Sequence, residues 1–138
     1  MRLPAVHCLA GLIAGLVVAA GPAALAAGEG FPDAGDYLLE AQPMKGLKRV
    51  PILYVESQQE AAFSLWCNRV DAKLIVVGDT ITIILSPPAQ PVQCDPERMQ
   101  ADETLVSALQ QVETWRRDGD VLVLQGGGEP LRFHLSSH

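Results

Sequence analysis

Apolar and polar residues alternate with a period of two along much of the chain, which is the pattern of half-buried β-strands. Runs that mix β-branched and aromatic residues, bounded by glycine, proline or polar clusters, predict strands at 36–43, 50–57, 61–67 and 131–135. Two longer runs are each interrupted by a Gly-Asp or Asp-Gly turn signal, and they predict hairpins at 72–86 and 112–125. Such short connections join neighbouring strands, so we expect an antiparallel sheet.

One helical pattern interrupts the strands late in the chain. Asp95 suits the N-cap, Pro96 suits the first helical position, and the helix is predicted to end near Gln110. Its apolar residues recur on one stripe, made of Ala101, Leu105, Ala108, Leu109 and Val112. The segment 87–94 before the helix holds three prolines, which excludes a helix or a central strand there. The predicted fold class is therefore α+β, with a mainly antiparallel curled sheet of about seven strands wrapped around one α-helix.

The N-terminal segment has a different pattern. A short basic start precedes an apolar run, roughly Leu9 to Ala20, and an Ala-Leu-Ala cleavage site ends at Ala26. These features predict a secretory signal peptide at 1–26, and the alternative membrane anchor is disfavoured because the apolar run is short for a span of ~20 residues. Residues 27–36 are expected to form a flexible leader to a domain at 37–138. The mature protein would then be periplasmic or secreted, without a stable membrane span.

Composition narrows the classes of function. The chain has 16 acidic and 10 basic residues and a net charge of −6, so it is a poor candidate for binding nucleic acid or an anionic membrane surface. No nucleophile–base pair, metal cluster or carboxylate pair stands out, and we therefore expect no catalytic residues, no cofactor and no metal ion. His134 and His138 have a metal-binding spacing for a helix but not for a strand. The glycines at 126–128 precede a strand, which favours a hairpin turn over a phosphate loop.

The cysteines become informative once export is assumed. Removal of the signal peptide would leave Cys67 and Cys94, an even pair in an oxidising compartment. A disulfide between them is the favoured interpretation, and two buried thiols are the alternative. Catalysis by Cys67 is disfavoured because neither remaining histidine stands in a recognisable motif.

Trp66, Asn68 and Arg69 surround Cys67 and form a candidate recognition patch, with Trp66 as an exposed aromatic anchor. The strand pattern places Cys67 on the same face as Phe63, and Trp66 on the opposite face. A structural interpretation stands beside this one. In it Asn68 turns the chain by hydrogen-bonding its backbone, Arg69 pairs with a carboxylate, and Trp66 packs beneath a loop.

Several segments occur in a recognisable order along the chain. They are "LWCNRV", the hairpin around "VVGDTITI", "VQCDPERM" at the helix start, "DETLVSALQQVETW", "DGDVLVLQ" and "EPLRF". Together they resemble the META domain, the HslJ-like family of small exported bacterial envelope proteins. The resemblance covers roughly Val50 to Phe133, and Cys-Asn-Arg is its most specific mark. The chain departs from the family pattern at Trp66, where glycine is usual, and in "AQPVQ" before the second cysteine, so it resembles a divergent member.

The resemblance implies a mainly antiparallel sheet around one helix, in agreement with the strand and helix pattern. It also implies export, an association with envelope stress and drug tolerance, and no enzymatic activity. The expected function is therefore envelope maintenance or stress or drug tolerance, through binding of an envelope protein or a small apolar ligand. The alternative is a secreted inhibitor of a hydrolase that acts through the proline-rich loop at 87–93.

Overall fold

The computed structural model describes residues 2, 11, 15 and 30–137, and the predicted signal peptide at 1–26 lies outside them apart from three isolated positions. The strands are β1 (Gly35–Leu39), β2 (Ile52–Val55), β3 (Glu60–Ser64), β4 (Arg69–Val77), β5 (Thr80–Leu85), β6 (Val112–Asp118), β7 (Val121–Gly126) and β8 (Leu131–Leu135). The helix α1 (Pro96–Gln110) lies between β5 and β6 in the chain. No helix in the described part of the chain is long and apolar enough to cross a membrane.

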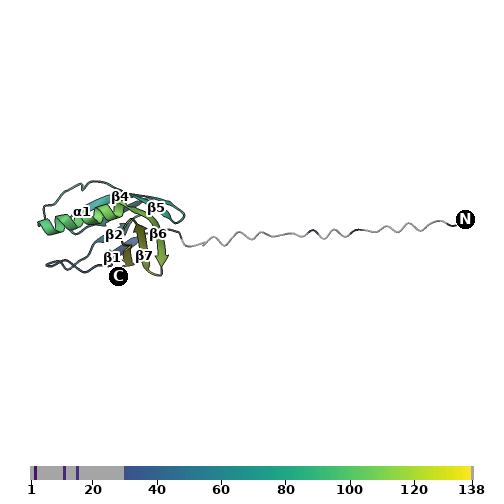
Figure 1. Ribbon diagram of the computed structural model, residues 1–138, viewed down its shortest axis with the longest axis horizontal. Helices are drawn as coiled ribbons and strands as arrows, with labels where there is room; N and C mark the ends of the chain where they lie inside the picture. The colour runs from purple at the N-terminus through teal and green to yellow at the C-terminus, as the bar shows by residue number, and fades with distance from the viewer. Residues whose placement is uncertain (1, 3–10, 12–14, 16–29, 138) are drawn as a thin grey trace.

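The eight strands form a closed barrel in which each strand pairs antiparallel with the next in the chain (Figure 1). The barrel closes through β1 and β8, where Tyr37 lies opposite Leu135 and Leu39 opposite Phe133. The antiparallel pairing was predicted, but the open curled sheet of about seven strands was wrong. The first and last strands pair with each other, and because they are far apart in the chain no local turn signal marks that pairing.

Charged side chains lie across the seam between β1 and β8. Glu40 accepts a hydrogen bond from Nε of Arg132 at 2.8 Å and lies 3.3 Å from Nε2 of His134. Hydrogen bonds from Arg132 and His134 lower the pKa of the Glu40 carboxyl below its usual value. His134 therefore lies at the seam in contact with Glu40, and His138, the other member of the predicted spacing, lies outside the described residues.

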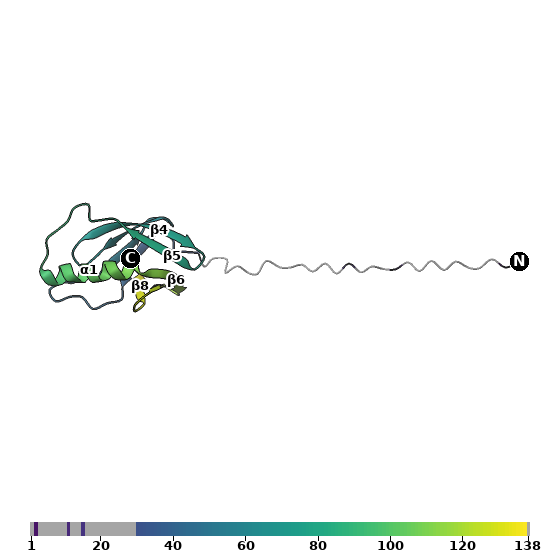
Figure 2. The same ribbon diagram turned by 45° about the horizontal axis from the view of Figure 1, so that its top comes forward.

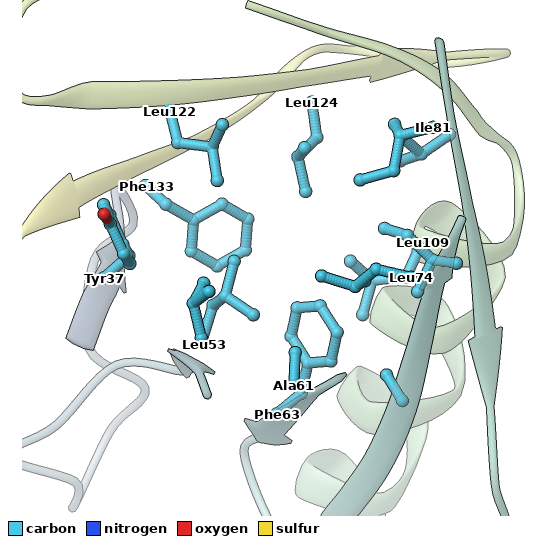
Figure 3. Close-up of a cluster of buried hydrophobic side chains, with 14 of the residues drawn as sticks. Tyr37, Leu53, Ala61, Phe63, Leu74, Ile81, Leu109, Leu122, Leu124 and Phe133 are labelled. Carbon is cyan, nitrogen blue, oxygen red and sulfur yellow. The ribbon is translucent and has the colours of Figure 1, made fainter. Parts of the chain in front are cut away.

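The barrel interior is filled with apolar side chains from the strands and the helix (Figure 3). Phe63 and Phe133 face each other with ring centroids 6.3 Å apart, and Leu53, Leu109 and Leu124 are buried around them. An eight-stranded barrel is just wide enough for its interior to be filled by side chains. The interior is thus the hydrophobic core of the domain.

Helix α1 has the predicted bounds and the predicted N-cap. The carboxylate of Asp95 accepts from the backbone N–H of Arg98 at 3.0 Å, and Leu105 and Leu109 are buried. β5 and β6 share the single register pair Thr80–Thr114, and α1 packs against β5 (Figure 2). The helix therefore covers the core where these two strands separate.

The segment before β1 is packed against the barrel. Phe31 and Pro32, which the sequence analysis placed in a flexible leader, are both buried. The ring of Phe31 lies edge-on to that of Trp115, with 5.4 Å between centroids. This contact brings the start of the domain to the end of the barrel near β6.

Gly126 provides a test of the packing between β7 and the junction of α1 and β6. A Cβ added at Gly126 would overlap the carbonyl oxygen of Gln111 and lie 2.9 Å from Cα of Val112. We expect Gly126→Ala to lower the free energy of unfolding by about 1–3 kcal/mol, because backbone must move to admit the methyl group. Gly128→Ala is the matched control, since nothing lies within 4 Å of its added Cβ. Urea unfolding of both variants measures the difference, and equal midpoints would contradict the close approach.

Candidate functional site

The first two residues of the Cys-Asn-Arg motif, Cys67 and Asn68, lie in the turn between β3 and β4, and Arg69 is the first residue of β4. β3 ends at Ser64, and the N–H of Leu65 donates to the carbonyl oxygen of Asn68 at 2.7 Å, so the chain reverses over these residues. The prediction that the strand continues to Cys67 was therefore wrong. A turn of this kind escapes the alternation pattern because its residues are partly apolar and lack glycine and proline.

A buried carboxylate on α1 holds this turn. Asp102 is 7% exposed, its Oδ1 accepts from the N–H of Cys67 at 2.9 Å, and its Oδ2 accepts from the N–H of Asn68 at 2.8 Å. Burial of an ionisable group is costly unless its polar atoms find partners, and here each oxygen has one. The helix is thus joined to the β3–β4 turn by two charge-assisted hydrogen bonds.

The side chain of Asn68 connects the same turn to the proline-rich loop. Its Oδ1 accepts from the N–H of Val92 at 2.7 Å, and its Nδ2 donates to the carbonyl oxygen of Val92 at 3.4 Å. One carboxamide therefore satisfies both backbone groups of Val92. Asn68 thus bonds to a backbone segment that is distant in the chain, which the sequence could not indicate.

Cys67 and Cys94 are joined by a disulfide, in agreement with the pairing predicted from the sequence. Their Cα atoms lie 6.1 Å apart, within the ~7 Å that a disulfide spans. Cys94 directly precedes the N-cap Asp95, so the bond ties the start of α1 to the β3–β4 turn. These contacts form one cluster, which we call the disulfide clasp. It consists of Cys67, Asn68, Val92, Cys94 and Asp102.

The structure also places the other two residues of the predicted recognition patch. Trp66 is half-buried and packs against the hydrophobic core, so it is not a fully exposed anchor. The guanidinium of Arg69 lies over the ring of Tyr54, 5.0 Å from its centroid, whereas the sequence analysis proposed a carboxylate partner. These contacts give Trp66 and Arg69 structural roles, and their role in recognition stays a prediction.

A second feature lies among the β2–β3 turn, the β4–β5 hairpin, β6 and the segment before β1. It is an open cleft of about 980 Å³, which we call the barrel-end cleft, and Phe31 and Trp115 form part of its wall. Trp115 fixes the hairpin beside it, because its Nε1 donates to the carbonyl oxygen of Gly78 at 2.8 Å and its backbone N–H donates to that of Asp79 at 2.9 Å.

Apolar side chains are exposed beside this cleft. Three of the five large hydrophobic residues exposed in the described part of the chain belong to the β4–β5 hairpin: Ile75 (51% exposed), Val77 (69%) and Ile84 (49%). Ile75 and Ile84 also line the cleft. Several large apolar side chains exposed beside one cleft favour a site of interaction there. Sequence reasoning missed the cleft because its residues come from four separate segments without a motif.

Comparison with known protein families gives one match. The sequence model of the META domain matches residues 36–138. The chain belongs to the META domain family. A search of curated proteins found no match.

A solved structure supports the fold of this META domain. This domain is similar to a DUF4847 family protein from Bacteroides vulgatus, known from a crystal structure, with a TM-score of 0.54 and 12% sequence identity. The alignment covers 73% of this chain and 92% of that chain. At this identity the likeness concerns the fold alone.

The hydrogen bonds of Asp102 give a prediction for the stability of the META domain. Asp102→Asn replaces one acceptor oxygen by an NH₂ group that faces a backbone N–H, so one turn amide loses its partner. We expect a loss of about 1–3 kcal/mol in the free energy of unfolding, measured by urea denaturation. Glu103→Gln, a change of the same kind at the exposed neighbouring residue, should change it by less than about 0.5 kcal/mol. Equal effects of the two changes would contradict the role of Asp102.

The disulfide gives a second stability prediction. It links residues 27 positions apart, and the chain-entropy model predicts that Cys67→Ser with Cys94→Ser costs about 3.5 kcal/mol. The double variant should keep its far-UV circular dichroism, because Asp102 and Asn68 still hold the turn. Its melting temperature should match that of the unmodified domain in excess reductant. Alkylation of both thiols in native, unreduced protein would contradict the bond.

Proposed function

We propose that this META domain is an exported, non-enzymatic binding module that takes up a small apolar ligand at the barrel-end cleft and so serves envelope maintenance or stress and drug tolerance. The observation that carries the proposal is the exposure of Ile75 and Ile84 on the wall of a cleft of about 980 Å³. Pockets for small ligands have volumes of roughly 300–1,000 Å³ and mostly apolar walls. A ligand that covers these side chains would remove apolar surface from water.

The packed interior favours an external site. Phe63, Phe133 and Leu109 have almost no solvent exposure and fill the space in which a wider barrel would hold a ligand (Figure 3). Opening that space would require the loss of core contacts. The cleft at the barrel end requires no such rearrangement, because its apolar wall is already exposed.

The chemistry of Cys67 supports a binding function over catalysis. Its sulfur is joined to Cys94, so the most conspicuous candidate nucleophile of the sequence has no thiolate to offer. In the described part of the chain, no group of three His, Cys, Asp or Glu residues has the arrangement of a metal site. Binding is therefore the function that we propose for this META domain.

A second candidate is the hydrolase inhibitor, and the structure of the proline-rich loop favours it. Val92 is 53% exposed although both of its backbone groups are bonded to Asn68, and Ser86 at the other end of the loop donates to the carbonyl oxygen of Asp71 at 2.9 Å. A pre-ordered loop loses little entropy when an enzyme binds it. We rank this candidate second because the loop exposes one large apolar side chain, whereas the hairpin exposes three.

The uncharged fluorescent probe N-phenyl-1-naphthylamine tests the first candidate. We expect it to bind the mature domain with a rise in fluorescence, and Ile84→Ser should weaken binding about tenfold because less apolar surface is covered. Val92→Ser is the matched control, since Val92 has similar exposure but lies in the proline-rich loop. Both sites are exposed, so neither change should alter the urea midpoint much. A loss of binding in Val92→Ser with normal binding in Ile84→Ser would move the site from the cleft to the loop.

A further inference from the structure

We propose that the outer face of the β4–β5 hairpin, which exposes Ile75, Val77 and Ile84, docks on the surface of a zwitterionic lipid membrane. We call this surface the hairpin face. Docking brings the barrel-end cleft next to the lipid. The inference goes beyond the proposed function, because it assigns a membrane-contacting surface and does not depend on a ligand in the cleft.

The hairpin face is apolar over most of its length. Its six residues form three register pairs: Val77–Thr80, Ile75–Thr82 and Lys73–Ile84. Leu74 and Ile83, which alternate with these residues, are buried in the core, so the six side chains share the outer face of the sheet. Ile84 is diagonal to Ile75, at a spacing that long side chains bridge. The three large apolar side chains are 49–69% exposed, and exposed apolar groups gathered on one face favour contact with a membrane or a protein.

The start of the domain lies beside this face and favours the membrane. Gly30 lines the barrel-end cleft together with Ile75 and Ile84. The predicted signal peptide ends at Ala26, and the four extended residues from there to Gly30 span at most about 14 Å. The apolar run of a signal peptide enters the membrane during export. The hairpin face is therefore within reach of a lipid surface when the domain emerges.

The charges near the hairpin face are balanced among themselves. Lys73 lies directly opposite Glu60 in the pairing of β4 with β3, and Arg116 on β6 lies 3.8 Å from Asp118. The face therefore presents apolar surface without an excess of positive charge. The whole chain has a net charge of −6, so an anionic lipid surface would repel it. These charges favour a zwitterionic lipid, bound by insertion of apolar side chains into the membrane interface.

The carboxylate of Asp79 points to the same class of lipid. Asp79 is exposed in the β4–β5 turn, beyond the last register pair of the hairpin face, and it lies beside the apolar Val77 only through that turn. A phosphatidylcholine or phosphatidylethanolamine head group carries a positive nitrogen that a carboxylate attracts, whereas phosphatidylglycerol carries none. Asp79 at the rim is therefore compatible with a zwitterionic surface and unfavourable at an anionic one.

Co-sedimentation of the mature domain with lipid vesicles tests the proposal. We expect the domain to bind vesicles of phosphatidylcholine, and binding to change little in high NaCl because apolar insertion is not screened by salt. Replacing half of the lipid by phosphatidylglycerol should weaken binding at least about threefold at low salt, and high NaCl should remove that difference. Tighter binding to the anionic vesicles would overturn the assigned lipid class.

Val77→Ser separates the hairpin face from the cleft, because Val77 belongs to the face but does not line the cleft. It should weaken binding to phosphatidylcholine vesicles about fivefold, and together with Ile75→Ser at least about tenfold, since less apolar surface leaves water. Binding of N-phenyl-1-naphthylamine without vesicles should be unchanged in Val77→Ser. Val92→Ser is the matched control, because Val92 is 53% exposed but lies in the proline-rich loop. The urea midpoints of Val77→Ser and Val92→Ser should match that of the unmodified domain.

The outcomes distinguish the two proposals. A domain that binds N-phenyl-1-naphthylamine but no vesicles would overturn the membrane surface and leave the proposed function intact. A domain that binds vesicles but not the probe would overturn the proposed function and leave the membrane surface intact. Equal loss of vesicle binding in Val77→Ser and Val92→Ser would overturn the assignment to the hairpin. A dimer in analytical ultracentrifugation that Val77→Ser abolishes, without vesicle binding, would assign the face to a second copy of the chain and overturn the proposal.

Discussion

The carboxylate of Asp102 is the constraint on which the arrangement of helix, turn and loop depends. Apolar contacts of Leu105 and Leu109 bury the helix but specify its position along the sheet only loosely, since such contacts are not directional. The two hydrogen bonds from Asp102 to the N–H groups of Cys67 and Asn68 are directional, and they fix α1 relative to the β3–β4 turn. The disulfide then holds the start of the helix at the same turn, and Asn68 holds the loop that leads into it.

The barrel topology places this clasp and the cleft at opposite ends of the molecule. Successive turns of an antiparallel barrel alternate between its two ends, so the β3–β4 turn with Cys67 lies at one end, and the β4–β5 turn at Gly78 lies at the other. The clasp end is held by a covalent bond and a buried carboxylate. The cleft end carries exposed apolar side chains that contribute little to stability, which is typical of regions that bind ligands. Stability and the proposed binding function are thus supplied by different ends of one barrel.

Local sequence patterns predicted the elements well, because strand alternation, turn residues and the cap at Asp95 act between near neighbours in the chain. They did not predict closure, since the pairing of Tyr37 with Leu135 links the two ends of the domain without a local signal. Asp102 could have been noticed, because it shares the helical stripe of Leu105 and Leu109 at spacings of three and seven residues. An acidic residue on a buried stripe predicts a polar partner, but the sequence does not say which N–H groups provide it. The cleft could not be predicted, because Phe31, Ile84 and Arg117 meet only in the folded chain.

In this domain the Cys-Asn-Arg motif makes its contacts within the fold. Each residue of Cys-Asn-Arg has a structural contact: Cys67 with Cys94, Asn68 with Val92, and Arg69 with Tyr54. The residues that we propose to contact a ligand, Ile75 and Ile84, lie outside that motif on the outer face of the β4–β5 hairpin. A META domain could keep the clasp, and with it the barrel, while the side chains at the cleft change. A fold does not fix a function, so the ligand that we propose for this domain is inferred from its own cleft and not from the family.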